Sequence, residues 1–214
     1  MLRAWPLLPI SLLLGALALA CGDDAGQPST PTTAATPSPV VAPTPMTFPE
    51  RPEITISPDK KYFATLETTK GIFRIELRPD IAIQTVNSFI FLARQGFYDG
   101  VTFHRVIPGF VAQGGDPTGT GSGDPGYTLP AEFSDVPFER GTVGMARGND
   151  PDSGGSQFFI AYSDQPDLNG QYTVFGKVVE GMEVIDSLTP RDPSNIATPQ
   201  PPGDTIISIK IEEE

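Results

Sequence analysis

The sequence of 214 residues predicts a mainly β protein, a closed antiparallel barrel whose ends are capped by two α-helices. Three observations lead to this prediction. Segments with the alternating pattern of strands outnumber those with helical spacing, and most connections between them are short. No internal repeat of about 20 to 50 residues is present, which argues against a solenoid or a propeller.

Residues 1–20 have the layout of a secretory signal rather than of a folded element. Arg3 supplies a positive charge, and the residues from Leu7 to Ala20 are almost all apolar. The only cysteine, Cys21, follows directly, so no disulfide can form within the chain. The stretch LALAC that ends at this cysteine resembles a bacterial lipobox. It implies that Cys21 is lipidated and anchors the protein on the extracytoplasmic side of the cell membrane. An ordinary signal with a chance cysteine is the alternative.

A disordered linker is predicted for residues 21–52. After Cys21 this segment holds eight of the 24 prolines and no basic residue before Arg51. It cannot bury enough apolar surface to offset its ordering entropy, and proline favours extended polyproline II. At about 3.1 Å per residue it could span roughly 80 Å. It would connect the membrane to a folded domain predicted at 53–214.

The folded part opens with a hairpin and a helix. YFATLETTKGIFRIELR, residues 62–78, alternates apolar and polar side chains on both sides of a turn at 69–71. Residues 83–95 predict a helix that ends before Gly96, because apolar side chains recur at helical spacing, at Val86, Phe89, Ile90 and Ala93.

The remaining elements are mostly short strands. Two of them, 101–107 and 109–115, flank Pro108–Gly109, and a loop rich in Gly, Pro and Thr follows over 116–130. The later elements are strands at 141–147, 156–163 and 173–179, a short helix at 182–188, and a final strand at 205–213.

The charge balance excludes one class of partner. The chain has 14 basic and 26 acidic residues, a net charge of −12. Binding to a nucleic-acid backbone depends on Lys and Arg, so we expect no nucleic-acid partner. The same sign argues against adhesion to anionic lipid headgroups through a basic patch.

Common catalytic arrangements find no support in the sequence. His104 is the only histidine, and no G-x-S-x-G motif supplies a nucleophile for it. One histidine and one lipidated cysteine cannot form a zinc site. NDPDSGG at 149–155 lacks the closing glutamate of a calcium loop, and GTGSGDPG at 119–126 lacks the lysine of a phosphate-binding loop. We therefore expect no metal and no cofactor.

Three stretches carry a resemblance to a known family. FHRVIPGFVAQGGDP (103–117), SQFFI (156–160) and TVFGKV (173–178) resemble the cyclophilin family of peptidyl-prolyl isomerases, and the likeness runs from about residue 61 to 213. It implies an eight-stranded antiparallel barrel with two capping helices, proline-containing polypeptides as substrates, and a monomer. With the signal, it predicts an enzyme that assists the folding of exported or cell-surface proteins. A non-catalytic cyclophilin-fold module or holdase is the alternative, and an adhesin is a third reading.

The implied reaction breaks no bond. Rotation about an X–Pro peptide bond has a barrier of about 18–20 kcal/mol, which arises from resonance between the nitrogen lone pair and the carbonyl. A donor that binds the lone pair once it is localised stabilises the twisted transition state but not the planar ground state. Arginine suits this role because it is a permanently charged donor.

The resemblance assigns roles to nine residues. Arg105 would donate to the proline nitrogen and contact the proline carbonyl, and Gln113 would bind the substrate backbone. The proline ring would lie in an apolar pocket, and Phe158, on the opposite strand face from Phe159, would belong to the core. The catalytic group would be Arg105, Gln113 and Phe110, and the substrate-binding group Val111, Ala146, Arg147, Phe159, Leu168 and Tyr172.

Two positions depart from the family pattern. Tyr172 stands where the family often has a histidine in the pocket wall, and Asp167 stands where it often has a tryptophan, directly before Leu168. The only tryptophan of the chain, Trp5, lies in the signal. In family members that are sensitive to cyclosporin, this tryptophan packs on the drug. We therefore expect an active isomerase that binds cyclosporin weakly.

Overall fold

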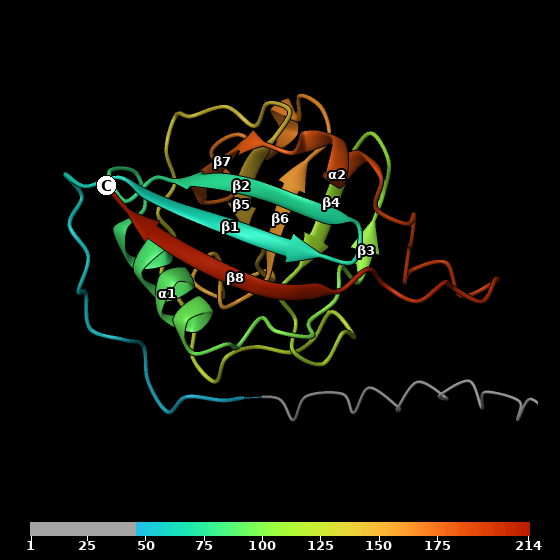
Figure 1. Ribbon diagram of the computed structural model, residues 1–214, viewed down its shortest axis with the longest axis horizontal. Helices are drawn as coiled ribbons and strands as arrows, with labels where there is room; N and C mark the ends of the chain where they lie inside the picture. Colours follow the sequence, from blue (N-terminus) through green and yellow to red (C-terminus); the bar gives the residue numbers. More distant parts are fainter. Residues whose placement is uncertain (1–45) are drawn as a thin grey trace, which may run out of the picture. The chain divides into compact units, whose positions relative to one another are not determined.

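The computed structural model describes residues 46–214, which contain one curled antiparallel sheet of eight strands and two α-helices (Figure 1). The predicted signal, Cys21 and the predicted linker up to residue 45 lie outside the described residues. No helix within residues 46–214 is long and apolar enough to cross a membrane.

The predicted strands and both predicted helices are present, several of them shorter than expected. In the first half of the domain they are β1 (Tyr62–Thr68), β2 (Gly71–Leu77), α1 (Ile83–Arg94), β3 (Arg105–Val106) and β4 (Val111–Gly114). In the second half they are β5 (Thr142–Met145), β6 (Phe158–Ala161), a 3-10 turn (Pro166–Leu168), β7 (Val174–Glu180), α2 (Met182–Asp186) and β8 (Ile206–Glu213).

The prediction of a closed barrel is wrong. The strand order is β3-β4-β6-β5-β7-β2-β1-β8, and the sheet is an open half-barrel with β3 and β8 at its two edges. Closure would require the edge strands to pair with each other along their length. Near the opening, an isolated bridge joins Thr102 to Thr205, and the N–H of Phe103 donates to the carbonyl of Asp204 at 2.8 Å. The two-residue β3 is too short to extend this contact into a ladder.

The main core fills the concave side of the sheet against α1. The predicted apolar stripe of this helix, from Val86 to Ala93, is buried, and Phe89 at its centre is fully enclosed. The ring of Phe89 lies 5.7 Å from that of Phe158 on β6 and 5.4 Å from that of Phe175 on β7. These contacts join strands from distant parts of the chain around one aromatic centre.

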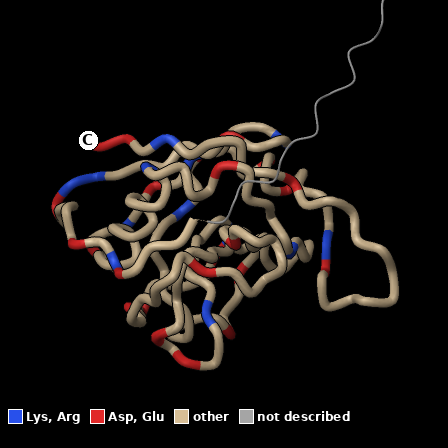
Figure 2. The backbone as a smooth tube through the Cα atoms, turned by 90° about the horizontal axis from the view of Figure 1, so that it is seen from below, with Lys and Arg blue, Asp and Glu red and all other residues tan. Residues whose placement is uncertain are grey.

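Charged residues are mixed over the surface. Figure 2 shows Asp and Glu positions along the whole described backbone, with Lys and Arg positions among them. The acidic excess of this part of the chain is therefore distributed over the domain and not gathered in one tail.

The end of the predicted linker packs on the domain. The ring of Phe48 lies edge-on to that of Phe91 on α1, with centroids 5.0 Å apart, and the N–H of Phe48 donates to the carbonyl of Pro125 at 2.7 Å. A Cβ on Gly126 would lie 2.5 Å from the carbonyl oxygen of Phe48, so only glycine permits this close approach. Phe48 thereby holds the segment 46–52 against α1 and the 116–130 loop.

We expect Phe48→Ala to reduce the free energy of unfolding by about 2 kcal/mol, because it removes a partly buried aromatic contact. Ile54→Ala is the control, since Ile54 lies two residues after this segment and is 54% exposed. It should change stability by less than about 0.5 kcal/mol. Urea denaturation of residues 46–214 with both variants measures the difference. Equal stability of Phe48→Ala and the parent would contradict the docking of this segment.

Candidate active site

Successive side chains of a strand point to opposite faces of the sheet. The central strands therefore present a second apolar surface on the convex side of the sheet. On β6, Phe158 and Ile160 point into the main core, which confirms the prediction for Phe158, and Phe159 points the other way. On this outer side a second buried cluster, called the pocket cluster here, consists of Val111, Phe138, Phe159 and Val174. Two of its members, Val111 and Phe159, line a cavity.

All nine residues assigned to the site from the resemblance line this one cavity, whose volume is about 100 Å³. They come from β3, β4 and β6, from the residues just before β4 and just after β5, from the 3-10 turn and from the segment before β7. The sheet therefore gathers residues that are up to 67 positions apart in the chain. The lining consists of Arg105, Phe110, Val111, Gln113, Ala146, Arg147, Phe159, Leu168 and Tyr172.

Three aromatic rings give the apolar side of the cavity a defined shape. Phe159 stacks on Phe138 with centroids 5.4 Å apart, and the ring of Tyr172 stands perpendicular to that of Phe159 at 5.4 Å. Gly144 on β5 makes room for the stack, because a Cβ there would lie 2.5 Å from Cζ of Phe159 and 2.7 Å from Cε1 of Phe138. The stack of Phe138 and Phe159 therefore requires a glycine at position 144.

Arg105 and Gln113 form the polar side of the cavity. The two residues face each other across β3 and β4, and an Nη1 group of Arg105 donates to Oε1 of Gln113 at 3.5 Å. The guanidinium carbon also lies 5.3 Å from the ring centroid of Phe110. Within residues 46–214 this long bond is the only hydrogen bond of the guanidinium, so its other N–H groups can donate to a ligand.

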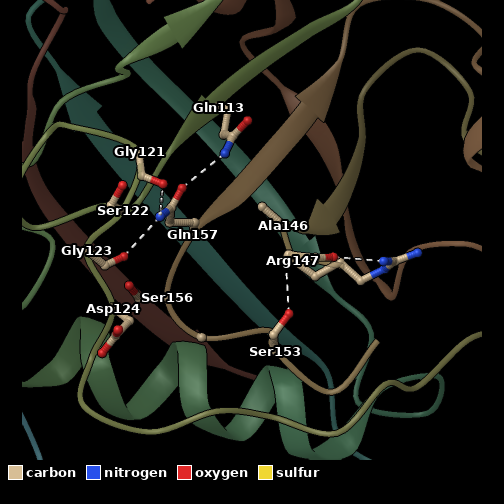
Figure 3. A pocket seen from close by; sticks show the side chains of 12 residues that line it. Gln113, Gly121, Ser122, Gly123, Asp124, Ala146, Arg147, Ser153, Ser156 and Gln157 are labelled. Atoms are coloured by element: carbon tan, nitrogen blue, oxygen red, sulfur yellow. Dashed lines mark hydrogen bonds between the residues drawn. The ribbon is translucent and has the colours of Figure 1, made fainter. Parts of the chain in front are cut away.

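Gln157 was not predicted from the sequence, although it orients the polar side. Its Oε1 accepts a hydrogen bond from Nε2 of Gln113 at 3.0 Å, and its own Nε2 donates to the carbonyls of Gly121 and Gly123 (Figure 3). The alternation of strand residues could have revealed it, because Gln157 and Phe159 share one face of the strand predicted at 156–163.

A second cavity of about 250 Å³ continues the first one. The two share Gln113, Ala146 and Arg147, so they form one groove. The guanidinium of Arg147 lies over the ring of Tyr172 at 4.8 Å, and its Nε donates to the carbonyl of Gln171 at 2.9 Å. Figure 3 shows the far wall of this cavity, which consists of the 121–124 segment opposite Ser153.

His104 is buried and lies outside the cavity lining. Burial lowers its pKa below the usual value, the nearby Asp116 opposes this effect, and the positive charges of Arg191 and Arg105 add to it. A neutral, enclosed imidazole is a poor proton shuttle for a ligand in the cavity. Ser153 is also engaged locally, since its Oγ accepts from the N–H of Gly148 at 2.8 Å.

Comparisons with known proteins agree with this geometry. The family model described as "Cyclophilin type peptidyl-prolyl cis-trans isomerase/CLD" matches residues 63–211. A peptidyl-prolyl cis-trans isomerase of Synechococcus elongatus is 46% identical over 150 residues, which cover 69% of this chain and 94% of the relative. Peptidyl-prolyl cis-trans isomerase B of Bacillus subtilis is 54% identical over 119 residues, which cover 55% of this chain and 82% of that protein.

Solved structures give the same result. The crystal structure of a Cryptosporidium parvum cyclophilin type peptidyl-prolyl cis-trans isomerase aligns with a TM-score of 0.64 and 34% identity, covering 71% of this chain and 98% of that one. Cyclophilin AquaCyp293 from Hirschia baltica aligns with a TM-score of 0.61 and 30% identity, covering 72% of this chain and 74% of the other. The chain belongs to the cyclophilin family, and it is a peptidyl-prolyl cis-trans isomerase.

Proposed function

We propose that this isomerase acts on X–Pro bonds of exported or cell-surface proteins and assists their folding, with the Arg105 cavity as its active site. The observation that carries the proposed active site is the convergence of the nine residues on one cavity that pairs an aromatic surface with an arginine. The choice of exported or cell-surface substrates rests on the signal predicted for residues 1–20. A solved structure of the Cryptosporidium parvum relative, 34% identical, was obtained in the presence of the dipeptide Ala-Pro, which supports a proline-containing substrate.

The cavity divides binding and catalysis between its two sides. The proline ring packs against the aromatic surface, where Phe159 and Tyr172 supply apolar area and Leu168 closes the edge. The guanidinium of Arg105 then lies beside the imide nitrogen and donates to its lone pair as the bond twists. No proton is transferred, so the enclosed His104 is not required.

Gln113 orients the guanidinium of Arg105 and also binds the substrate backbone. Both ends of its amide are engaged, since Oε1 accepts from Arg105 and Nε2 donates to Gln157. A primary amide has a second N–H and further acceptor capacity, which remain for the substrate backbone. This arrangement limits the rotation of the arginine and leaves its N–H groups directed at the cavity.

A refolding assay tests the proposed activity. The substrate is a secreted-type protein whose slow phase reflects X–Pro isomerisation, which takes tens of seconds unaided. Catalytic amounts of residues 46–214 should accelerate that phase. Suppressed aggregation with an unchanged slow phase would instead identify a holdase, and the proposed action on such proteins would be wrong.

The proposed location depends on lipid at Cys21. We expect Cys21→Ser to move the protein from the membrane fraction to the soluble fraction, because acyl chains contribute about 0.8 kcal/mol per buried methylene. Fractionation after a high-salt wash, with Arg105→Ala as a variant that retains the cysteine, measures this. A Cys21→Ser protein that is fully processed and still membrane-bound would contradict the lipid anchor.

A further inference from the structure

The 189–203 loop, which is part of the connection between α2 and β8, covers the open edge of β3. Figure 1 shows the chain leaving α2, passing β3 and returning to β8. The N–H of Arg191 donates to the carbonyl of Val106 at 2.9 Å, and the N–H of Val106 donates to the carbonyl of Arg191 at 2.7 Å. One residue of the loop thus acts as a ladder partner for the edge strand that carries Arg105.

The side chain of Arg191 connects the residue before β3 to the other end of the loop. Its Nε donates to the carbonyl of His104 at 3.1 Å, and its Nη1 donates to the carbonyl of Pro201. The base of the loop is also closed, because the N–H of Asp192 donates to Oε1 of Gln200 at 3.0 Å. Hydrogen bonds from Arg191 therefore reach the residues directly before and directly after Arg105.

In the described sheet, β4 is the only strand that neighbours β3. β3 consists of two residues, and its ladder with β4 comprises the pairs Arg105–Gln113 and Val106–Ala112. An edge strand this short has little cooperative support along its own length. The direction of a strand side chain follows its backbone, so a shift of β3 would move the Arg105 guanidinium away from its place beside Phe110 and Gln113.

We propose that Arg191 is a positioning residue for Arg105, acting through the backbone of β3. This inference rests on the proposed catalytic role of Arg105. Arg105 stabilises the twisted transition state, whereas the aromatic surface binds the planar ground state. Loosening β3 therefore lowers kcat and leaves KM nearly unchanged, since the ring-binding residues lie on other elements.

The test compares Arg191→Met with Arg140→Met. Arg140 is the matched control, because it also joins a backbone carbonyl, that of Tyr162, to a second group, the carboxylate of Asp186, and it is outside the cavity lining. Both kcat and KM are measured on a proline tetrapeptide by NMR exchange, well below the unfolding temperature of each variant.

We expect Arg191→Met to lower kcat about tenfold with KM within about twofold of the parent, and Arg140→Met to change neither by more than about twofold. An unchanged kcat in folded Arg191→Met overturns the proposal. A reduced unfolding temperature without a reduced kcat also overturns it, because that is the result of a purely structural role.

Arg191→Lys keeps the test decisive if Arg191→Met does not fold. A lysine retains the charge but cannot donate in the fork geometry to both carbonyls, so kcat should fall at least about threefold. An unchanged kcat in this variant overturns the proposal. Arg105→Ala is measured in parallel: if it is inactive and both Arg191 variants match the parent, only the role of Arg191 fails. If Arg105→Ala retains full activity, the proposed active site fails as well.

Discussion

Arg105→Ala should lower kcat/KM for a proline tetrapeptide by about a hundredfold while the domain stays folded. The guanidinium is half-buried on a two-residue strand, and its single hydrogen bond within residues 46–214 is the long one to Gln113. Its removal therefore costs the fold little. The variant loses stabilisation of the transition state and not of the ground state, because the imide lone pair is localised only in the twisted state.

Three further variants separate this role from other chemistry. Arg105→Lys keeps the charge but offers one compact donor, and we expect it to recover only part of the lost activity. His104→Gln and Ser153→Ala remove the residues that a nucleophilic mechanism would need, and their rates should stay within a few-fold of the parent. Coupled isomerase assays with circular dichroism as the folding check measure all four variants. Near-normal activity of folded Arg105→Ala would exclude the mechanism.

Asp167→Trp should raise the affinity for cyclosporin at least tenfold and change the turnover of a proline peptide much less. Asp167 is exposed at the centre of the 3-10 turn, directly before Leu168, which lines the cavity. An ionised aspartate has no donor and no apolar face, and an apolar ligand beside it would have to desolvate its charge. A tryptophan at this position adds a large apolar surface and an indole N–H.

Inhibition titrations of the isomerase activity measure the drug affinity of each variant. Asp164→Trp is the matched control, because Asp164 is an exposed acid shortly before the 3-10 turn and is outside the cavity lining. It should leave drug affinity within about threefold of the parent. Tight inhibition of the unmodified protein by cyclosporin would show that Asp167 does not limit binding.

The sequence by itself determined the elements, and it indicated the residues that line the Arg105 cavity. Alternation over residues 62–78 predicted the β1–β2 hairpin, and the apolar spacing around Phe89 predicted α1, because a strand or helix must present one apolar face to a core. The contiguous 103–117 stretch, through its resemblance to a known family, indicated Arg105 and Gln113, which the structure places across β3 and β4.

Only the tertiary structure decided whether the sheet closes into a barrel and which residues support the site. Whether the barrel closes depends on residues 102 and 205 meeting across a gap, and nothing in either local sequence determines the length of that contact. Arg191 lies between the helix predicted at 182–188 and the strand predicted at 205–213, and Phe48 lies in the predicted linker. Each acts through partners far away in the chain, His104 and Phe91 respectively.

The physical reason is the range of the interactions involved. Side-chain periodicity and turn chemistry act over a few residues, so they can be read along the chain. The hydrogen bonds of Gln157 to Gln113 and of Arg191 to His104 join positions 44 and 87 residues apart. They exist only once the main core has brought β3, β4, β6 and the 189–203 loop together, because packing of the whole domain sets those distances.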